Sequence, residues 1–198
     1  MPDPSPSGDS ARVRLFVAAT IPDELLQRLA RSSEPLRRRW PAARWTDPAN
    51  QHVTLKFLGW ADAGMLDDVH AACRAVASAN APAKLSLGEL GAFPSARRAR
   101  VLWVGLEDPA GLLARIARGL DESLEPLGFP GEKRAFTAHL TLARMKTPVG
   151  VGEWPDVEID PTPWTSRTVT LFRSHLSPKG ARYEALDEIP LGGSASGG

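Results

Sequence analysis

Two stretches of one pattern, His52-Val53-Thr54-Leu55 and His139-Leu140-Thr141-Leu142, stand in the two halves of this chain of 198 residues. In both, apolar residues alternate with His and Thr, which is the period-two pattern of a half-buried strand. Side chains two residues apart in a strand lie on one face, separated by about 6.6 Å. One imidazole and one hydroxyl of each stretch can therefore reach the same ligand.

The alternation continues beyond the first stretch to Lys56 and Phe57. It places Lys56 on the polar face with His52 and turns Phe57 toward the core. In the second stretch, Leu140 and Leu142 are expected to face the core. A single copy of the pattern is typical of a strand with a tolerated surface histidine, but its repetition favours a shared chemical role.

Two histidines in equivalent settings are the minimum equipment for metal-free acid–base chemistry on a phosphate. In-line displacement at phosphorus places the attacking water and the leaving oxygen on opposite sides, so the acid and the base must stand on opposite walls of a cleft. One imidazole must then be protonated and the other neutral, which predicts a bell-shaped pH profile that belongs to the pair. The residue pattern alone does not assign the two roles.

The charge balance limits how the chain could bind nucleic acid. It has 24 Lys and Arg against 23 Asp and Glu, for a net charge of +1, which is too little for a protein that coats a duplex. A nucleic-acid substrate would have to be recognised locally, at an end. The single cysteine, Cys73, excludes an internal disulfide and is expected to be a buried thiol on an amphipathic helix.

The two ends of the chain differ in composition from the rest. Residues 1–12 are rich in Pro, Ser and Asp and lack the apolar core of a secretion signal, so we expect a disordered lead. The Gly- and Ser-rich residues 192–198 are expected to be a flexible tail. No apolar run approaches the roughly 20 residues that span a bilayer. These features predict a soluble, cytoplasmic protein with one bilobal domain over residues 13–191.

Strand patterns and helix patterns alternate between these ends, and the motif strand appears once in each half. This order predicts an internally duplicated α+β fold with a cleft between two lobes. Residues 148–163, with four prolines and two glycines, are expected to form an irregular connection. We expect strands at residues 14–19, 84–90, 99–106, 136–143, 168–174 and 181–186, and helices at 22–31, 63–78 and 109–124.

An ordered series of segments over residues 14–191 resembles the 2H phosphoesterase superfamily, specifically its RNA 2′,3′-cyclic phosphodiesterases, also labelled 2′-5′ RNA ligases. The resemblance implies two pseudo-symmetric lobes, each an antiparallel sheet with helices packed outside, enclosing a central cleft. It also implies hydrolysis of a terminal 2′,3′-cyclic phosphate to a 2′-phosphate, with no metal or other cofactor. Besides the two motifs, it rests on residues 14–18, 50–59, 91–94, 101–105, 136–144, 174–176 and 180–186.

The resemblance also assigns roles to the motif residues. It makes His52 the proton donor to the departing 3′ oxygen and His139 the proton acceptor that activates water. It makes Thr54 and Thr141 hydrogen-bond donors to the nonbridging phosphate oxygens. The expected partners are RNA or oligonucleotide ends that carry the cyclic phosphate, with no membrane involved, and we expect a monomer.

Three neighbouring residues are further candidates for substrate binding, each with a structural alternative. Arg144 needs a bend or a strand end to reach the face of His139, and could instead form an ion pair. Lys56 could draw in phosphate or extend to solvent. Phe136 could stack on a base or pack in the core. A basic cluster could line an RNA path or form a solvated loop: Arg97, Arg98 and Arg100.

Other functions are alternatives to hydrolysis. In 2′-5′ RNA ligation, a ribose 5′-hydroxyl replaces water at the cyclic phosphate, and the same residues would serve both reactions. A non-catalytic RNA-end-binding module has no evident need for an acid–base pair. A metal hydrolase is disfavoured because neither motif has metal-ligand spacing. The sequence leaves open whether the substrate is a tRNA fragment, another oligonucleotide or a small cyclic phosphate.

Overall fold

The computed structural model of the chain describes residues 12–177 and 180–192. The predicted disordered lead and flexible tail lie outside the described residues, apart from their innermost positions, 12 and 192. No helix in the described part of the chain is long and apolar enough to cross a membrane.

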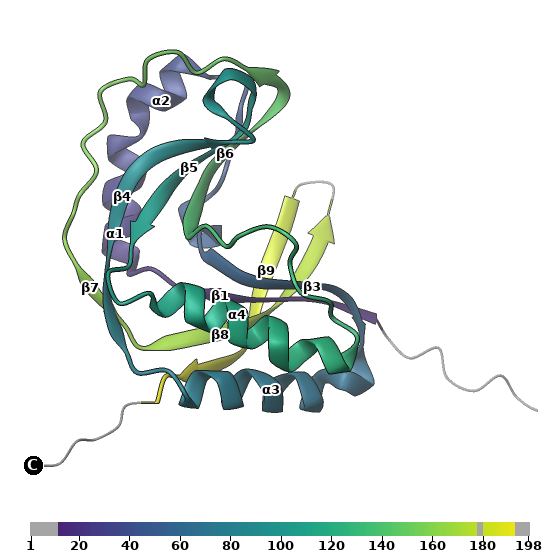
Figure 1. The fold of residues 1–198 in the computed structure, drawn as a ribbon. Helices are drawn as coiled ribbons and strands as arrows, with labels where there is room; N and C mark the ends of the chain where they lie inside the picture. Colours follow the sequence, from purple (N-terminus) through teal and green to yellow (C-terminus); the bar gives the residue numbers. More distant parts are fainter. Residues whose placement is uncertain (1–11, 178–179, 193–198) are drawn as a thin grey trace, which may run out of the picture.

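The described strands form two antiparallel sheets, which Figure 1 shows one above the other. The lower sheet has the order β3-β1-β8-β9, with β1 at Arg12–Ala19, β3 at Val53–Asp62, β8 at Thr168–Ser177 and β9 at Gly180–Pro190. The upper sheet has the order β2-β6-β5-β4-β7, with β2 at Arg44–Trp45, β4 at Ala83–Phe93, β5 at Ala99–Glu107, β6 at His139–Val149 and β7 at Trp164–Ser166.

Helices accompany each sheet. In Figure 1, α1 and α2 lie beside the upper sheet, and α3 and α4 lie beneath the lower one. This arrangement confirms the predicted α+β fold with two lobes. The helices span Asp23–Ser32 (α1), Glu34–Arg39 (α2), Leu66–Ser78 (α3) and Leu112–Leu124 (α4), and short 3₁₀ turns lie at Pro48–Asn50 (η1), Ala63–Met65 (η2), Ala96–Arg98 (η3) and Glu125–Leu127 (η4).

The chain crosses repeatedly between the two sheets instead of completing one lobe before the other. It leaves the lower sheet after β1, returns for β3, builds β4 to β7 in the upper sheet and closes with β8 and β9 in the lower one. The first histidine motif therefore begins the edge strand β3 of the lower sheet, and the second begins β6 of the upper sheet. Residues 150–163 form the predicted irregular connection.

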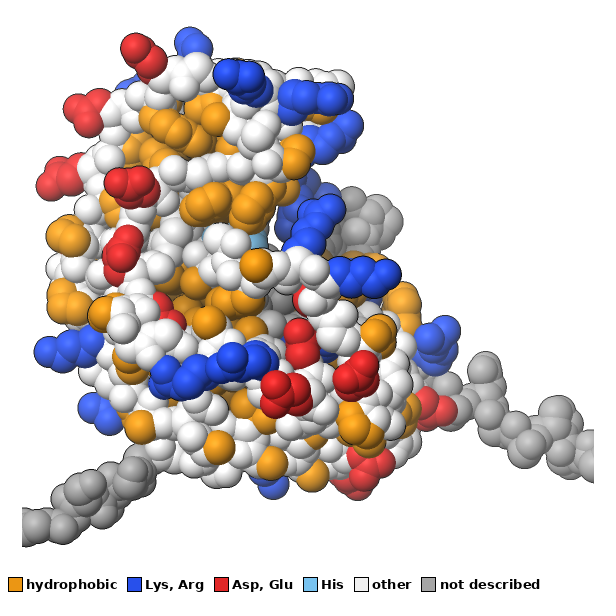
Figure 2. Space-filling model, viewed as in Figure 1, with side chains coloured by type: hydrophobic (Ala, Val, Ile, Leu, Met, Phe, Trp, Pro, Cys, Tyr) orange, Lys and Arg blue, Asp and Glu red, His pale blue; other side chains and the backbone are white. Residues whose placement is uncertain are grey.

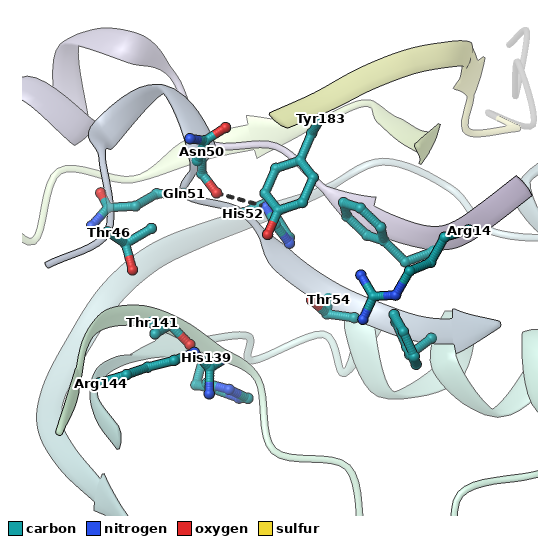
Figure 3. Close-up of a pocket in the computed structure, with 12 residues that line it drawn as sticks. Arg14, Thr46, Asn50, Gln51, His52, Thr54, His139, Thr141, Arg144 and Tyr183 are labelled. Atoms are coloured by element: carbon teal, nitrogen blue, oxygen red, sulfur yellow. Dashed lines mark hydrogen bonds between the residues drawn. The ribbon is translucent and has the colours of Figure 1, made fainter. Parts of the chain in front are cut away.

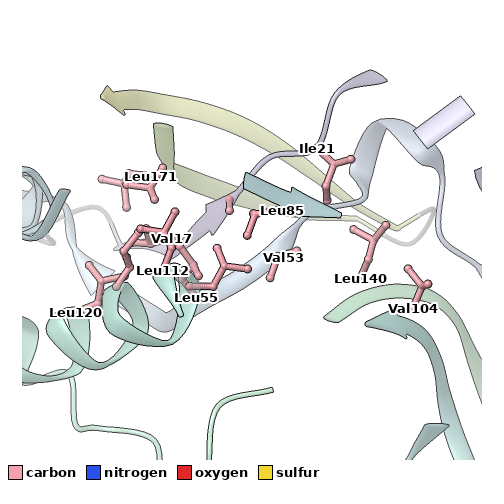
Figure 4. Close-up of a cluster of buried hydrophobic side chains, with 14 of the residues drawn as sticks. Val17, Ile21, Val53, Leu55, Leu85, Val104, Leu112, Leu120, Leu140 and Leu171 are labelled. Carbon is pink, nitrogen blue, oxygen red and sulfur yellow. The ribbon is translucent and has the colours of Figure 1, made fainter. Parts of the chain in front are cut away.

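Helix α4 shows how the sequence fixes the core. Its apolar residues recur at helical spacing and are buried, and the helix packs against β3 and α3 (Figure 4). It starts later than residue 109 because the Asp108 carboxylate accepts the N–H groups of Leu112 and Leu113, at 3.0 and 2.7 Å. Cys73 of α3 is buried, as predicted.

The predicted alternation of faces along β3 is wrong after Thr54. Relative to β1, the strand carries one extra residue at Leu55 and another at Leu58. Such bulges reverse which residues face which side. Phe57 therefore shares the face of Thr54 and is 43% exposed, whereas Lys56 turns inward and is 2% exposed.

Strand β6 has an equivalent bulge. Relative to β5 it carries one extra residue at Leu142, between Thr141 and Ala143. The bulge turns Arg144 outward on the face of His139, which a regular strand would not allow. Arg144 thus occupies the position in the second copy that Phe57 occupies in the first.

Candidate active site

A pocket of about 390 Å³ lies between the two sheets and contains both motifs (Figure 3). His52 and Thr54 stand on the wall formed by the sheet of β3, and His139, Thr141 and Arg144 stand on the facing wall formed by the sheet of β6. The structure thus brings these sequence-predicted residues together. The remaining lining residues are Arg14, Phe16, Thr46, Asn50, Gln51, Phe57 and Tyr183.

Both imidazoles are oriented in the same way. Nδ1 of His52 lies 2.9 Å from the carbonyl oxygen of Asn50, and Nδ1 of His139 lies 2.8 Å from that of Thr137. A carbonyl oxygen only accepts hydrogen bonds, so each Nδ1 carries a proton and each neutral ring presents Nε2 as an acceptor. Each Nε2 can then take up a proton and return it to a ligand.

His52 rests on aromatic rings of the lower sheet. Its ring stacks on Phe16 at a centroid distance of 4.7 Å and meets the edge of Tyr183 at 5.1 Å. Burial lowers the pKa of His52 to about 4, and the charge of His139 acts in the same direction, although the hydrogen bond to Asn50 opposes both. His52 is therefore neutral at pH 7 in the protein alone.

Arg14 and Tyr183 are among the pocket residues that were not singled out from the sequence. Arg14 of β1 places its guanidinium over the Phe57 ring, 4.5 Å from the centroid, and donates a hydrogen bond to Ser174 Oγ at 3.0 Å. Tyr183 comes from β9, far along the chain. The available signals were an arginine between two apolar residues, Val13 and Leu15, and the single tyrosine of the sequence.

Lys56 does not line the histidine pocket. The prediction that it shares the face of His52, from which it could contact phosphate, is therefore wrong. Its ammonium lies 2.5 Å from Asp121 Oδ1 and 2.5 Å from the carbonyl oxygen of Pro130, and its side chain is 1% exposed. The alternative that it extends to solvent is also wrong. The bulge at Leu55 is the reason, because it turns Lys56 toward α4.

Phe136 lies in a second cavity of about 870 Å³ that adjoins the first at Thr54, Phe57 and His139. It is partly buried and packs against the core, as the structural alternative proposed. Arg100 lines the same second cavity. The two other arginines of the basic cluster, Arg97 and Arg98, are exposed on η3.

Over residues 12–177 and 180–192, no group of three or more His, Cys, Asp or Glu side chains is placed to hold a metal ion.

The comparison with known families agrees with this geometry. The model of the LigT-like phosphoesterases matches the chain twice, over residues 20–103 and 104–183, and each match contains one histidine motif. The chain belongs to this family. The match confirms the resemblance to 2H phosphoesterases and the duplication inferred from the sequence.

Individual relatives cover most of the chain. A protein of Methanothermobacter thermautotrophicus named RNA 2′,3′-cyclic phosphodiesterase is 30% identical, over 91% of this chain and 100% of the relative. One of Thermus thermophilus with the same name is 33% identical, over 91% of each chain. A crystal structure of a Thermus thermophilus protein superposes with a TM-score of 0.79 at 31% identity, over 91% of this chain and 99% of that one.

Proposed function

We propose that this LigT-like phosphoesterase hydrolyses RNA 2′,3′-cyclic phosphate ends to 2′-phosphates without a metal ion, with His52 and His139 as its acid–base pair. The names of the relatives support the substrate class. The observation that carries the mechanism is the presence of two imidazoles on opposite walls of one pocket, each with Nδ1 held by a carbonyl and Nε2 available.

In the proposed reaction, the cyclic phosphate lies between the two walls. His139 accepts a proton from water as the water oxygen attacks phosphorus. The bond from phosphorus to the 3′ oxygen breaks, and His52 donates a proton to that oxygen. The products are a 2′-phosphate and a 3′-hydroxyl. Thr54 and Thr141 donate hydrogen bonds to the nonbridging oxygens, and the Arg144 guanidinium offsets their charge.

The proton-donor role requires that His52 gain a proton in the complex. Its pKa of about 4 leaves it neutral at pH 7 in the protein alone. An anionic phosphate beside the ring favours the imidazolium and raises the pKa. We therefore propose that substrate binding is coupled to proton uptake at His52.

The affinity of a His139→Ala variant for an oligoribonucleotide with a 2′,3′-cyclic phosphate should fall as pH rises from about 5 to about 8. The phosphodiester stays anionic across this range, so the uptake of a proton by His52 is what becomes harder. Calorimetric titrations in buffers of different protonation enthalpy measure that proton directly. A further His52→Gln substitution should remove this proton uptake. An affinity of the single variant that does not change with pH would contradict the coupling.

The test of the function itself uses the same oligoribonucleotide with the wild-type protein in excess EDTA. Mass spectrometry and phosphatase sensitivity identify the new end. A 2′-phosphate supports both the reaction and its independence of metal, whereas turnover only after a divalent metal is restored would overturn that independence. Adding an RNA with a 5′-hydroxyl tests the alternative, 2′-5′ ligation, through the appearance of a joined product.

Thr54→Val and Thr141→Val should each slow turnover by roughly ten- to a hundredfold, because a hydrogen bond to a charged oxygen contributes about 1.5–3 kcal/mol. The valine is close in shape, so the fold should be kept. Steady-state kinetics on the cyclic oligonucleotide measure the effect. Thr168→Val is the matched control, since Thr168 lies in β8 and does not line this pocket. An unchanged rate in both motif variants would exclude the proposed hydrogen bonds.

A further inference from the structure

Two large aromatic side chains of β3 are exposed next to the histidine pocket. Phe57 is 43% exposed and Trp60 is 52% exposed. The bulges at Leu55 and Leu58 bring both rings to the face that carries Thr54. Rings this exposed bury little surface and so contribute little to the stability of the fold. Their position on one face next to a pocket indicates a binding site.

A groove of about 490 Å³ joins these rings. One side is formed by Phe57, Leu58 and Trp60 of β3, and the other by residues 128–134. Phe57 also lines the histidine pocket, so the groove and the pocket meet at this ring. A substrate strand that leaves the pocket past Phe57 would enter the groove directly.

Cations outnumber anions among the charged residues at the groove. Lys133 and Arg134 line it together with a single acidic residue, Glu132. The Arg12 guanidinium donates a hydrogen bond to the carbonyl oxygen of Trp60 at 3.2 Å, and Arg14 covers Phe57. In Figure 2, Lys and Arg side chains form a band down the right-hand side of the molecule, beside the hollow between the lobes. Aromatic rings flanked by cations are the pattern of single-stranded nucleic-acid sites.

We propose that this groove binds the nucleotides on the 5′ side of the cyclic phosphate, with a base stacked on Trp60 and backbone phosphates beside Lys133 and Arg134. The inference rests on the proposed function. A 2′,3′-cyclic phosphate occupies both the 2′ and the 3′ oxygen of the terminal ribose, so the RNA can continue only through the 5′ oxygen. The preferred substrate is accordingly an oligoribonucleotide and not a cyclic mononucleotide.

The spacing of the rings fits such a strand. Phe57 and Trp60 pair with Phe16 and Arg14, which are two residues apart on β1, so the two rings lie about 6.6 Å apart along the sheet and each can contact a different base. Because stacking does not depend on base identity, the groove should distinguish the length of a substrate and not its sequence.

The experiment compares kcat/KM for a tetraribonucleotide with a 2′,3′-cyclic phosphate and for 2′,3′-cyclic AMP. The wild-type protein should favour the tetranucleotide, and Trp60→Ala should lower the ratio of the two values about tenfold, mainly through KM on the longer substrate. Trp60→Phe should restore most of the ratio. Leu176→Ala, at a similarly exposed apolar residue of β8, is the matched control and should leave the ratio unchanged.

The charges are tested in the same assay. Lys133→Ala combined with Arg134→Ala should weaken the tetranucleotide preference and make it less sensitive to salt. An unchanged ratio in both the Trp60→Ala and the double variant would overturn the proposal. So would an equal loss on both substrates, which would indicate a disturbed fold. If Phe136→Ala removed the preference and Trp60→Ala did not, the RNA would leave through the second cavity instead.

A binding measurement separates this inference from the proposed function. If the wild-type protein hydrolyses neither substrate, the proposed function fails, but the groove can still be tested with a labelled tetranucleotide by fluorescence anisotropy. Trp60→Ala should then raise the Kd about tenfold. Equal Kd values for the wild-type and Trp60→Ala proteins would exclude the groove as an RNA site.

Discussion

Replacing His139 with alanine is expected to lower kcat/KM for a cyclic-phosphate oligoribonucleotide by roughly a hundredfold to ten thousandfold, the usual contribution of one acid–base group. The Thr137 carbonyl holds Nδ1 of this ring at 2.8 Å, which leaves Nε2 as the base toward water. Alanine removes that base without filling its place. His52→Ala should cause a loss of similar size, because the departing 3′ oxygen then has no proton donor.

The control for these variants is another histidine of the same chain. His70 lies on α3, with Nδ1 3.3 Å from Asp187 Oδ2, and does not line the pocket. His70→Ala should keep full activity, which excludes a general effect of losing an imidazole. Thermal melting should show that all three variants remain folded. Normal turnover in either pocket variant would refute the acid–base pair.

The sequence contained the chemical core of this site. The repeated pattern predicted two motif strands, and the structure places His52, Thr54, His139 and Thr141 in one pocket. The pattern was sufficient because each threonine follows its histidine by two positions, before the bulge at Leu55 or Leu142. The family resemblance then supplied the two-lobed architecture.

The residues beyond each threonine could not be placed in this way. A bulge is created by the pairing of β3 with β1, or of β6 with β5, and not by the strand that carries it. The bulge at Leu55 of β3 reversed the expected faces of Lys56 and Phe57. The bulge at Leu142 of β6 supplied the bend that Arg144 required. Tyr183 comes from β9, so its place depends on sheet order, which local alternation does not encode.

The ion pair of Lys56 and Asp121 is expected to have the second large effect, on the stability of the fold. The carboxylate of Asp121, in α4, pairs with Lys56 of β3, and its Oδ2 accepts the N–H of Glu132 at 3.2 Å. Lys56 also donates to the carbonyl oxygen of Pro130. This cluster therefore fastens the segment before the second motif to the strand of the first.

Asp121→Ala is expected to lower the free energy of unfolding by about 3–5 kcal/mol, the usual cost of leaving a buried charge without its partner. The two partners are unequal. The Lys56 side chain is 1% exposed, whereas the Asp121 side chain is 28% exposed. Removing the carboxylate therefore costs more than removing the ammonium, and Lys56→Met should destabilise the protein less. Urea denaturation measures both changes.

Two further variants separate the ion pair from a general effect on α4. Glu122→Ala removes the neighbouring exposed carboxylate of the same helix and should change the unfolding free energy by less than about 0.5 kcal/mol. In a Lys56→Met background, Asp121→Ala should cost far less than in the wild-type protein, because no buried ammonium is left unpaired. If Asp121→Ala is equally costly in both backgrounds, the carboxylate stabilises the fold through its bond to Glu132 and not through Lys56.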